Sequence, residues 1–202
     1  MKEELISKFN KDKVCENKQR YDYDKLEYII VGDNPGKEEK KQERYFVGTS
    51  GKQLRQFFEN EIIVGKKFDD SCIVFNKTFI HTAKTEDLKK IRANDTALFD
   101  KILICCAEEI VKLSNEKNLP ILIFGKTHLK PNSMFEPFWK EINKSVEKKG
   151  NILVYNHPSY NNFNKEWKKY KEQYPTSDNR ELLINKIGTE NTKTINNLYP
   201  KK

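Results

Sequence analysis

Four short runs of apolar residues recur along the chain, and a polar or glycine-containing loop follows each of them directly. Each run is continuously apolar and rich in β-branched or aromatic side chains, which is typical of parallel strands that are buried on both faces. The runs cover residues 28–31, 72–75, 121–124 and 152–155. We therefore predict four buried strands.

The segments between these runs carry apolar residues at helical spacing. The strongest pattern lies in residues 96–113, where Asn94 or Asp95 is placed to cap the first turn. Further helices are predicted at residues 51–61, 135–148, 164–173 and 179–186. Strands that alternate with helices favour an α/β fold with three layers, α/β/α, around a central, mostly parallel four-stranded sheet.

No linker or internal repeat divides the chain, so we expect a single domain over residues 1–202. Its hydrophobic content of 36% is sufficient for a buried core. Residues 1–22 are expected to form a helix or a partly ordered arm, and the polar residues 188–202 a loose tail. The apolar runs are far shorter than the roughly 20 residues of a membrane helix, and residues 1–13 do not resemble a secretory signal.

The four cysteines do not follow a metal-binding or disulfide pattern. None of them forms a C-x-x-C pair, and three stand in apolar runs, where cysteine is usually a small buried hydrophobe. We therefore expect a cytoplasmic protein without a metal site. The cysteines are Cys15, Cys72, Cys105 and Cys106.

The net charge of +8, from 38 basic and 30 acidic residues, permits a nucleic-acid partner. Most of the basic residues are lysines mixed among Glu and Asp, as on any solvated surface. The charge alone therefore does not identify the partner, and the identification depends on the sequence motifs.

The unusual polar residues of this chain follow its strands, and ligands of open α/β sheets bind outside the carboxyl ends of strands. The first group, Gly32-Asp33-Asn34-Pro35-Gly36, predicts a tight turn that holds Asp33 and Asn34 at the sheet edge. An ordinary strand-to-helix turn would use the same residue types. The second group, Tyr45-Phe46 before Val47-Gly48-Thr49-Ser50-Gly51, offers an aromatic shelf for a flat base, or a core residue before a helix.

Two further polar groups follow the second and fourth strands. The Asn76 carboxamide presents donors and an acceptor in one plane, which matches the N3–H and O4 groups of uracil; a bond to its own loop is the alternative. His157 stands in Asn156-His157-Pro158-Ser159-Tyr160. A neutral imidazole there can donate a hydrogen bond to a developing oxyanion, and a purely structural histidine is the alternative.

In this order, the four groups resemble the uracil-DNA glycosylase superfamily. The resemblance spans residues 28–167 and rests on Gly32-Asp33-Asn34-Pro35-Gly36, Phe46-Val47-Gly48-x-x-Gly51, Asn76 and His157-Pro158-Ser159. The first two motifs look most like the thermostable, iron–sulfur branch. Asn34, followed by Pro35-Gly36, instead looks like the mismatch-specific and single-strand-selective branches, and the motif at His157 also looks like the single-strand-selective branch. The branch is therefore unresolved.

Three positions depart from the patterns of these branches. The iron–sulfur branch needs four spaced cysteines, two of them before the first motif, and here only Cys15 precedes it, so no cluster is expected. Asp33 stands where that branch usually carries Glu. Gly36 stands where the best-known branch carries a Tyr that blocks the thymine methyl group, which leaves thymine rejection open.

The resemblance implies a monofunctional hydrolase of base excision repair that removes uracil, or a related deaminated base, after it flips out of DNA. A monomer that needs no metal or organic cofactor is expected. The implied catalytic residues are Asp33, Asn34, Glu39 and His157. The implied substrate-binding residues are Gly32, Phe46, Asn76 and Ser159. The implied DNA-binding residues are Tyr160, Phe163, Lys126, Lys130 and Lys165, with Tyr160 and Phe163 as candidates for the wedge that fills the vacated position in the base stack.

Two other functions stay open from the sequence. A catalytically weak or inactive member of the superfamily would bind nucleic acid without cleaving it, and Asp33 in place of the commoner Glu keeps that alternative open. A hydrolase of a small nucleoside, or of another base such as hypoxanthine, is the third. Positive charge that serves the nucleic-acid partner is expected to gather at the mouth of the site, near Lys37, Lys77, Lys126, Lys130 and Lys165, rather than to cover the molecule.

Overall fold

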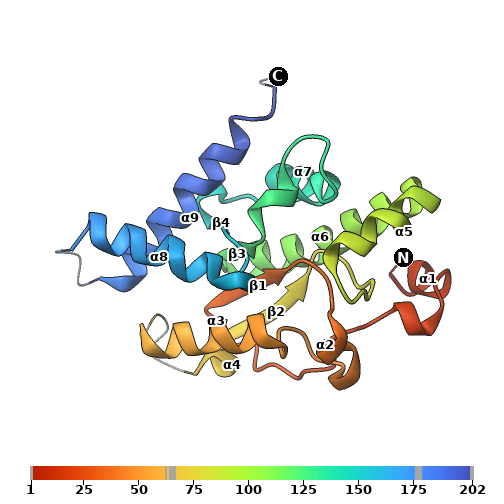
Figure 1. The fold of residues 1–202 in the computed structure, drawn as a ribbon, viewed down its shortest axis with the longest axis horizontal. Helices are drawn as coiled ribbons and strands as arrows, with labels where there is room; N and C mark the ends of the chain where they lie inside the picture. The colour runs from red at the N-terminus through yellow and green to blue at the C-terminus, as the bar shows by residue number, and fades with distance from the viewer. Residues whose placement is uncertain (1, 62, 64–66, 176–178, 201–202) are drawn as a thin grey trace.

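A computed structural model describes residues 2–61, 63, 67–175 and 179–200. At its centre lies a sheet of four parallel strands in the order β2-β1-β3-β4, with helices on both faces (Figure 1). Ile30 at the middle of β1 pairs with Val74 on one side and Leu122 on the other. The strands are β1 (Tyr28–Gly32), β2 (Cys72–Asn76), β3 (Ile121–Phe124) and β4 (Ile152–Tyr155). The predicted strands and the three-layer α/β/α fold are confirmed.

The helices of the described residues lie where the apolar spacing placed them, with several short additions. The α-helices are α1 (Lys2–Ser7), α2 (Lys37–Gln42), α3 (Thr49–Asn60), α4 (Phe68–Ser71), α5 (Leu88–Asn94), α6 (Thr96–Lys117), α7 (Glu136–Ser145), α8 (Asn162–Gln173) and α9 (Arg180–Asn196). Short 3₁₀ turns are η1 (Lys11–Lys13), η2 (Thr85–Asp87), η3 (Lys126–Leu129), η4 (Lys149–Asn151) and η5 (Ser159–Asn161). Asp95 caps α6 by accepting a hydrogen bond from the backbone N–H of Leu98 at 2.9 Å.

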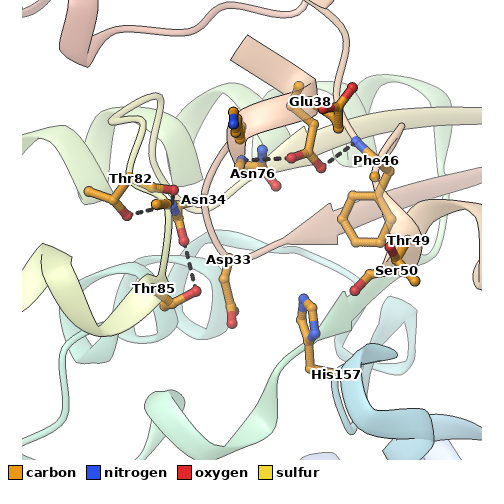
Figure 2. Close-up of a pocket in the computed structure, with 15 residues that line it drawn as sticks. Asp33, Asn34, Glu38, Phe46, Thr49, Ser50, Asn76, Thr82, Thr85 and His157 are labelled. Atoms are coloured by element: carbon orange, nitrogen blue, oxygen red, sulfur yellow. Dashed lines mark hydrogen bonds between the residues drawn. The ribbon is translucent and has the colours of Figure 1, made fainter. Parts of the chain in front are cut away.

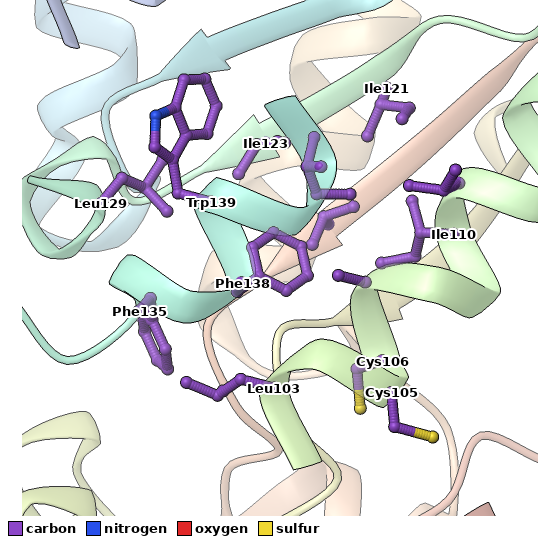
Figure 3. Packing of buried hydrophobic residues seen from close by; sticks show 14 of the residues in the cluster. Leu103, Cys105, Cys106, Ile110, Ile121, Ile123, Leu129, Phe135, Phe138 and Trp139 are labelled. Carbon is purple, nitrogen blue, oxygen red and sulfur yellow. The ribbon is translucent and has the colours of Figure 1, made fainter. Parts of the chain in front are cut away.

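Alternate residues of each strand point to opposite faces of the sheet and bury two separate apolar clusters. On one face, Ile121 and Ile123 pack among the side chains of α6 and α7 (Figure 3). On the other face, Leu122 and Phe124 pack among residues of α3, α8 and α9. Because both faces are covered, the strands carry no polar alternation, and this is why they read as continuous apolar runs.

The polar C-terminal segment contradicts the expected loose tail. Helix α9 continues to Asn196 and packs along β4, an edge strand of the sheet. Asn191 donates a hydrogen bond to the carbonyl of Val154 at 3.0 Å, and Thr192 donates one to the carbonyl of Ile152 at 2.9 Å. The polar side chains therefore satisfy the free edge of the sheet rather than face solvent. Residues 201–202 of the expected tail lie outside the described residues.

The N-terminal segment covers the opposite edge of the sheet. After α1 and η1, the chain runs along β2, where Asn17 donates to the carbonyl of Val74 at 2.9 Å. The hydroxyl of Tyr21 accepts from the backbone N–H of Val74 at 3.3 Å. The expected arm is thus an ordered cover for an edge strand, and Met1 lies outside the described residues.

All four cysteines are free and buried. Cys15 and Cys72 belong to one apolar cluster, while Cys105 and Cys106 belong to the other. Burial raises the pKa of the Cys15 thiol to about 11 and that of the Cys106 thiol to about 12. Thiols of this kind behave as small apolar side chains rather than as nucleophiles. Separately, none of the described helices is both long enough and apolar enough to cross a membrane.

Candidate functional site

A cavity of about 290 Å³ opens at the carboxyl ends of the strands. It is lined by Asn76 at the end of β2, by residues that follow β1, β2 and β4, and by the turns that begin α2 and α3 (Figure 2). The cavity brings together six of the eight predicted catalytic and substrate-binding residues, and these are Asp33, Asn34, Glu39, Phe46, Asn76 and His157. Segments that are more than one hundred residues apart in the chain therefore meet at one place.

Phe46 forms an aromatic wall of the cavity in a strained backbone conformation. Its φ angle of 55° lies in the left-handed region, which a non-glycine residue adopts only when its surroundings enforce it. Its backbone N–H donates to a carboxylate oxygen of Glu39 at 3.1 Å, and Arg55 donates to its carbonyl. Gly51 lies so close to this backbone that a Cβ atom would collide with it.

Asn76 presents an unpaired donor. Its side chain is 4% exposed, and its Nδ2 atom is buried without a hydrogen-bond partner. A buried amide donor without a partner is costly, so it is rare unless a ligand supplies the acceptor. Gly32 makes this position possible, because a Cβ atom there would overlap both the Phe46 ring and the Asn76 carboxamide.

His157 faces the same space as a neutral imidazole. Its Nδ1 atom accepts a hydrogen bond from the backbone N–H of Ser159 at 3.1 Å, which leaves the proton on Nε2. Burial lowers the pKa of His157, and the nearby Lys77 lowers it further, while Asp33 opposes the shift. The centroid of its ring lies 6.5 Å from that of Phe46. The cavity therefore holds a neutral N–H donor opposite the amide of Asn76.

Asp33 lies deep in the cavity and pairs with a lysine. The residue is 8% exposed, and its Oδ1 atom lies 2.5 Å from the ammonium nitrogen of Lys77, a residue with no exposed surface. Lys77 was expected at the mouth of the site, and that expectation is wrong. Because side chains alternate along a strand, Asn76 and Lys77 leave the end of β2 in opposite directions, and only Asn76 reaches the cavity.

Glu39 and Asn34 are held by hydrogen bonds within the cavity wall. Glu39 accepts from the backbone N–H of Gly36 at 2.6 Å as well as from Phe46, and burial raises the pKa of its carboxyl group. Asn34 donates to the hydroxyl of Thr82 at 2.9 Å and accepts from the hydroxyl of Thr85 at 2.8 Å. Both side chains therefore fix the shape of the cavity wall.

The candidate wedge residues lie in very different places. Tyr160 is 88% exposed, and it is followed by Asn161; both have left-handed φ angles, of 54° and 60°. Phe163 is 1% exposed, and its ring packs edge-on against those of Phe124 and Tyr155. Phe163 is therefore part of the core, and only Tyr160 projects from the molecule beside His157.

The predicted DNA-binding lysines and Ser159 do not line the cavity. Lys126 forms an ion pair with Glu166 at 2.8 Å and a hydrogen bond with Asn191 at 2.9 Å, so its charge is compensated. Lys130 and Lys165 are exposed. Ser159 contacts the back of the His157 imidazole, where its hydroxyl lies 2.8 Å from Nδ1.

Several lining residues were not among the catalytic, substrate-binding or DNA-binding residues expected from the sequence. Thr82 and Thr85 follow β2 and close one side of the cavity. Thr49 and Ser50 belong to the first turn of α3, where backbone N–H groups have no partner within the helix and favour an anion. The polar residues that follow the end of β2 were the feature of the sequence from which Thr82 and Thr85 could have been predicted as lining residues.

Comparison with known proteins agrees with this geometry. No curated protein sequence matches the chain significantly. The family model described as the uracil DNA glycosylase superfamily matches residues 19–176, a span that contains every side chain of the cavity. A match over most of the chain, with the motif residues gathered in one cavity, shows that this chain belongs to the uracil DNA glycosylase superfamily.

Proposed function

We propose that this protein hydrolyses the N-glycosidic bond of uracil, or of a related deaminated base, in DNA and leaves an abasic site. The superfamily supports a glycosylase-type role in general. The cavity lies at the carboxyl ends of the strands, and its volume of about 290 Å³ suits a single flipped base.

The buried, unpaired amide of Asn76 is the observation that carries this proposal. In the proposed complex, Nδ2 donates to O4 of uracil and Oδ1 accepts from N3–H. Cytosine carries an amino donor in place of O4, so it would leave two donors facing each other. A site with buried hydrogen-bonding groups discriminates strongly against a base that leaves them unpaired. Phe46 supplies the apolar wall on which the base stacks.

His157 stabilises the leaving base in the proposed reaction. The bond between C1′ and N1 breaks with its electron pair moving to the base, which leaves as an anion. The Nε2–H group of neutral His157 donates to O2, where the negative charge develops. The removal of one such donor typically slows a reaction by about 10²–10³-fold.

Asp33 acts on the sugar side of the same bond. Loss of the base leaves a cation on C1′ and its ring oxygen, and the carboxylate stabilises this charge. Water then adds to C1′ and releases a proton, which Asp33 is placed to accept. Asn34 is fully engaged with Thr82 and Thr85, so we assign the charge-stabilising role to Asp33 alone.

DNA would approach the face from which Tyr160 projects. Tyr160 is our candidate for the wedge that occupies the vacated position in the base stack, because Phe163 is buried. The exposed Lys130 and Lys165 would contact phosphates, which positions DNA without reading its sequence. The proposed reaction needs neither a metal nor an organic cofactor, since water is the only co-reactant.

The proposal is tested on oligonucleotides that carry uracil opposite guanine, opposite adenine or in a single strand. After incubation with protein, alkali cleaves the strand wherever an abasic site has formed. We expect cleavage with the wild-type protein and a loss of about 10²–10³-fold with His157→Ala. Equal cleavage by both proteins would contradict the assignment of His157.

The absence of cleavage on every substrate would contradict the proposed hydrolysis. Tight, salt-dependent binding of the same oligonucleotides would then favour the alternative of an inactive member that holds nucleic acid. Release of hypoxanthine but not of uracil would retain the reaction and change its substrate.

A further inference from the structure

The side chain of Lys77 joins the carboxyl ends of three neighbouring strands. It leaves the end of β2, and its ammonium nitrogen lies 2.5 Å from Asp33 Oδ1 and 3.4 Å from the carbonyl of Gly32, both at the end of β1. It also lies 2.6 Å from the carbonyl of Phe124 at the end of β3. An ammonium group has three hydrogen atoms to donate, and these three acceptors account for all of them.

The Asp33 carboxylate is confined from a second side by Gly125. This glycine follows β3 with a φ angle of 98°, which side chains rarely permit, and a Cβ atom there would collide with the carboxylate. Lys77 holds Oδ1 while Gly125 lets the carboxylate lie against the backbone. The direction in which Asp33 points is therefore set by groups that do not line the cavity.

A buried ion pair of this kind contributes little to folding. The cost of removing two charges from water roughly cancels their attraction, so apolar residues of the same size often serve a core equally well. The consequence of the pair is local. The ammonium lies behind the cavity and the carboxylate lies within its wall, so the pair turns its negative end toward the cavity.

The protonation of the pair depends on few neighbours. Burial lowers the pKa of the Lys77 ammonium, and the carboxylate of Asp33 opposes that shift. The other titratable groups that act on Asp33 are His157 after β4 and Glu86 in η2, and His128 in η3 lies near both of these groups. The face of the Phe135 ring covers the ammonium, with its centroid 5.2 Å from the nitrogen.

We propose that Lys77 is a positioning residue for base excision. Its ammonium places a buried positive charge beside the Asp33 carboxylate and aims that carboxylate at the sugar cation without touching the substrate. This inference rests on the proposed function and deepens it. It keeps the negative charge on Asp33 and adds a buried cationic partner, Lys77, which is the residue next to the base-reading Asn76.

The test compares pH–rate profiles for excision of uracil in a single turnover. Lys77→Met removes the charge and keeps the length of the side chain, whereas Lys77→Arg keeps a charge. Lys140→Met removes a lysine from a surface ion pair on α7 and serves as the control. We expect the acid limb of Lys77→Met to lie about one to three pH units above that of the wild type, as expected when an adjacent opposite charge is lost. Lys77→Arg and Lys140→Met should keep the wild-type limb.

A second comparison holds even if Lys77→Met alone does not fold. The single variant Asp33→Asn lacks the carboxylate and leaves the ammonium of Lys77 unpaired. The double variant, Asp33→Asn with Lys77→Met, lacks both the carboxylate and the ammonium. Because Lys77 acts through Asp33, we expect the two to excise uracil at the same rate. A further loss of tenfold or more in the double variant would overturn the inference.

Failure of this inference differs visibly from failure of the proposed function. A wild-type protein that releases no base from any substrate would refute the proposed function, and the inference with it. An active wild type whose Lys77→Met variant folds and keeps the same acid limb would refute only the role of Lys77. Circular dichroism of each variant shows whether it folds.

Discussion

The backbone N–H of Ser159 donates a hydrogen bond to Nδ1 of His157 at 3.1 Å, and this single contact determines which face of the imidazole is a donor. With Nδ1 occupied as an acceptor, the neutral ring carries its proton on Nε2. The imidazole therefore meets a ligand as a hydrogen-bond donor without a positive charge.

The tautomer of His157 can be observed directly. Nitrogen NMR of the imidazole at pH 7 should show a protonated Nε2 and an unprotonated Nδ1. Ser159→Ala should keep this pattern, because it removes the hydroxyl and leaves the backbone donor in place. A proton on Nδ1 would mean that the Ser159 hydroxyl is the acceptor, and the proposed donor to uracil O2 would be lost.

The stability of the fold should decrease as the pH falls past the ordinary pKa of histidine. Burial lowers the pKa of His157 below its usual value of 6.5, so the unfolded chain binds a proton that the folded protein does not. Protonation therefore favours unfolding below about pH 6.5. Urea unfolding between pH 5 and 8 measures this dependence, which should become shallower in His157→Gln. An unchanged slope would show that His157 titrates as it does in water.

The identity of the residue at position 76 should decide which base is accepted. Asn76→Asp places a carboxylate acceptor opposite uracil O4, so we expect uracil release to fall by about 10²-fold or more. The amino group of cytosine would instead find an acceptor, and release of cytosine should become measurable. Asn76→Ala is the control and should release neither base efficiently. Retention of uracil release by Asn76→Asp would refute the assigned role.

Substitution of Tyr160 should affect excision from duplex DNA, whereas substitution of Phe163 should affect the stability of the fold. Tyr160 is exposed, so Tyr160→Ala should change the free energy of unfolding by no more than about 0.5 kcal/mol. It should slow excision from a duplex more than from a single strand, since only a duplex leaves a gap to fill. Phe163→Ala should instead destabilise the fold by about 3–5 kcal/mol. Equal loss of activity on both substrates with Tyr160→Ala would contradict the wedge.

The positions of the strands and the convergence of the motifs could be predicted because both follow from local patterns. A strand buried on both faces is continuously apolar, and parallel strands that end at one edge bring their following loops together. This is why Asp33, Asn76 and His157 could be expected in one site.

Other features depend on contacts between distant segments. The polar residues of α9 bond the edge of β4, so Asn191 and Thr192 are buried although their composition predicts a tail. The left-handed backbone of Phe46 depends on Glu39, Arg55 and Gly51 together. The burial of Lys77 against the ends of β1 and β3 could not be predicted either, because a lone lysine after a strand is usually solvated.

The central claim is that the cavity selects uracil and releases it as a free base, and mass spectrometry of the released bases tests this most directly. Single-turnover reactions would use duplexes that differ only in one base, which is uracil, thymine, cytosine or hypoxanthine opposite guanine. The account predicts free uracil in amounts equal to the abasic sites formed, with no cytosine. Bound but intact uracil DNA, or release of cytosine at the rate of uracil, would contradict it.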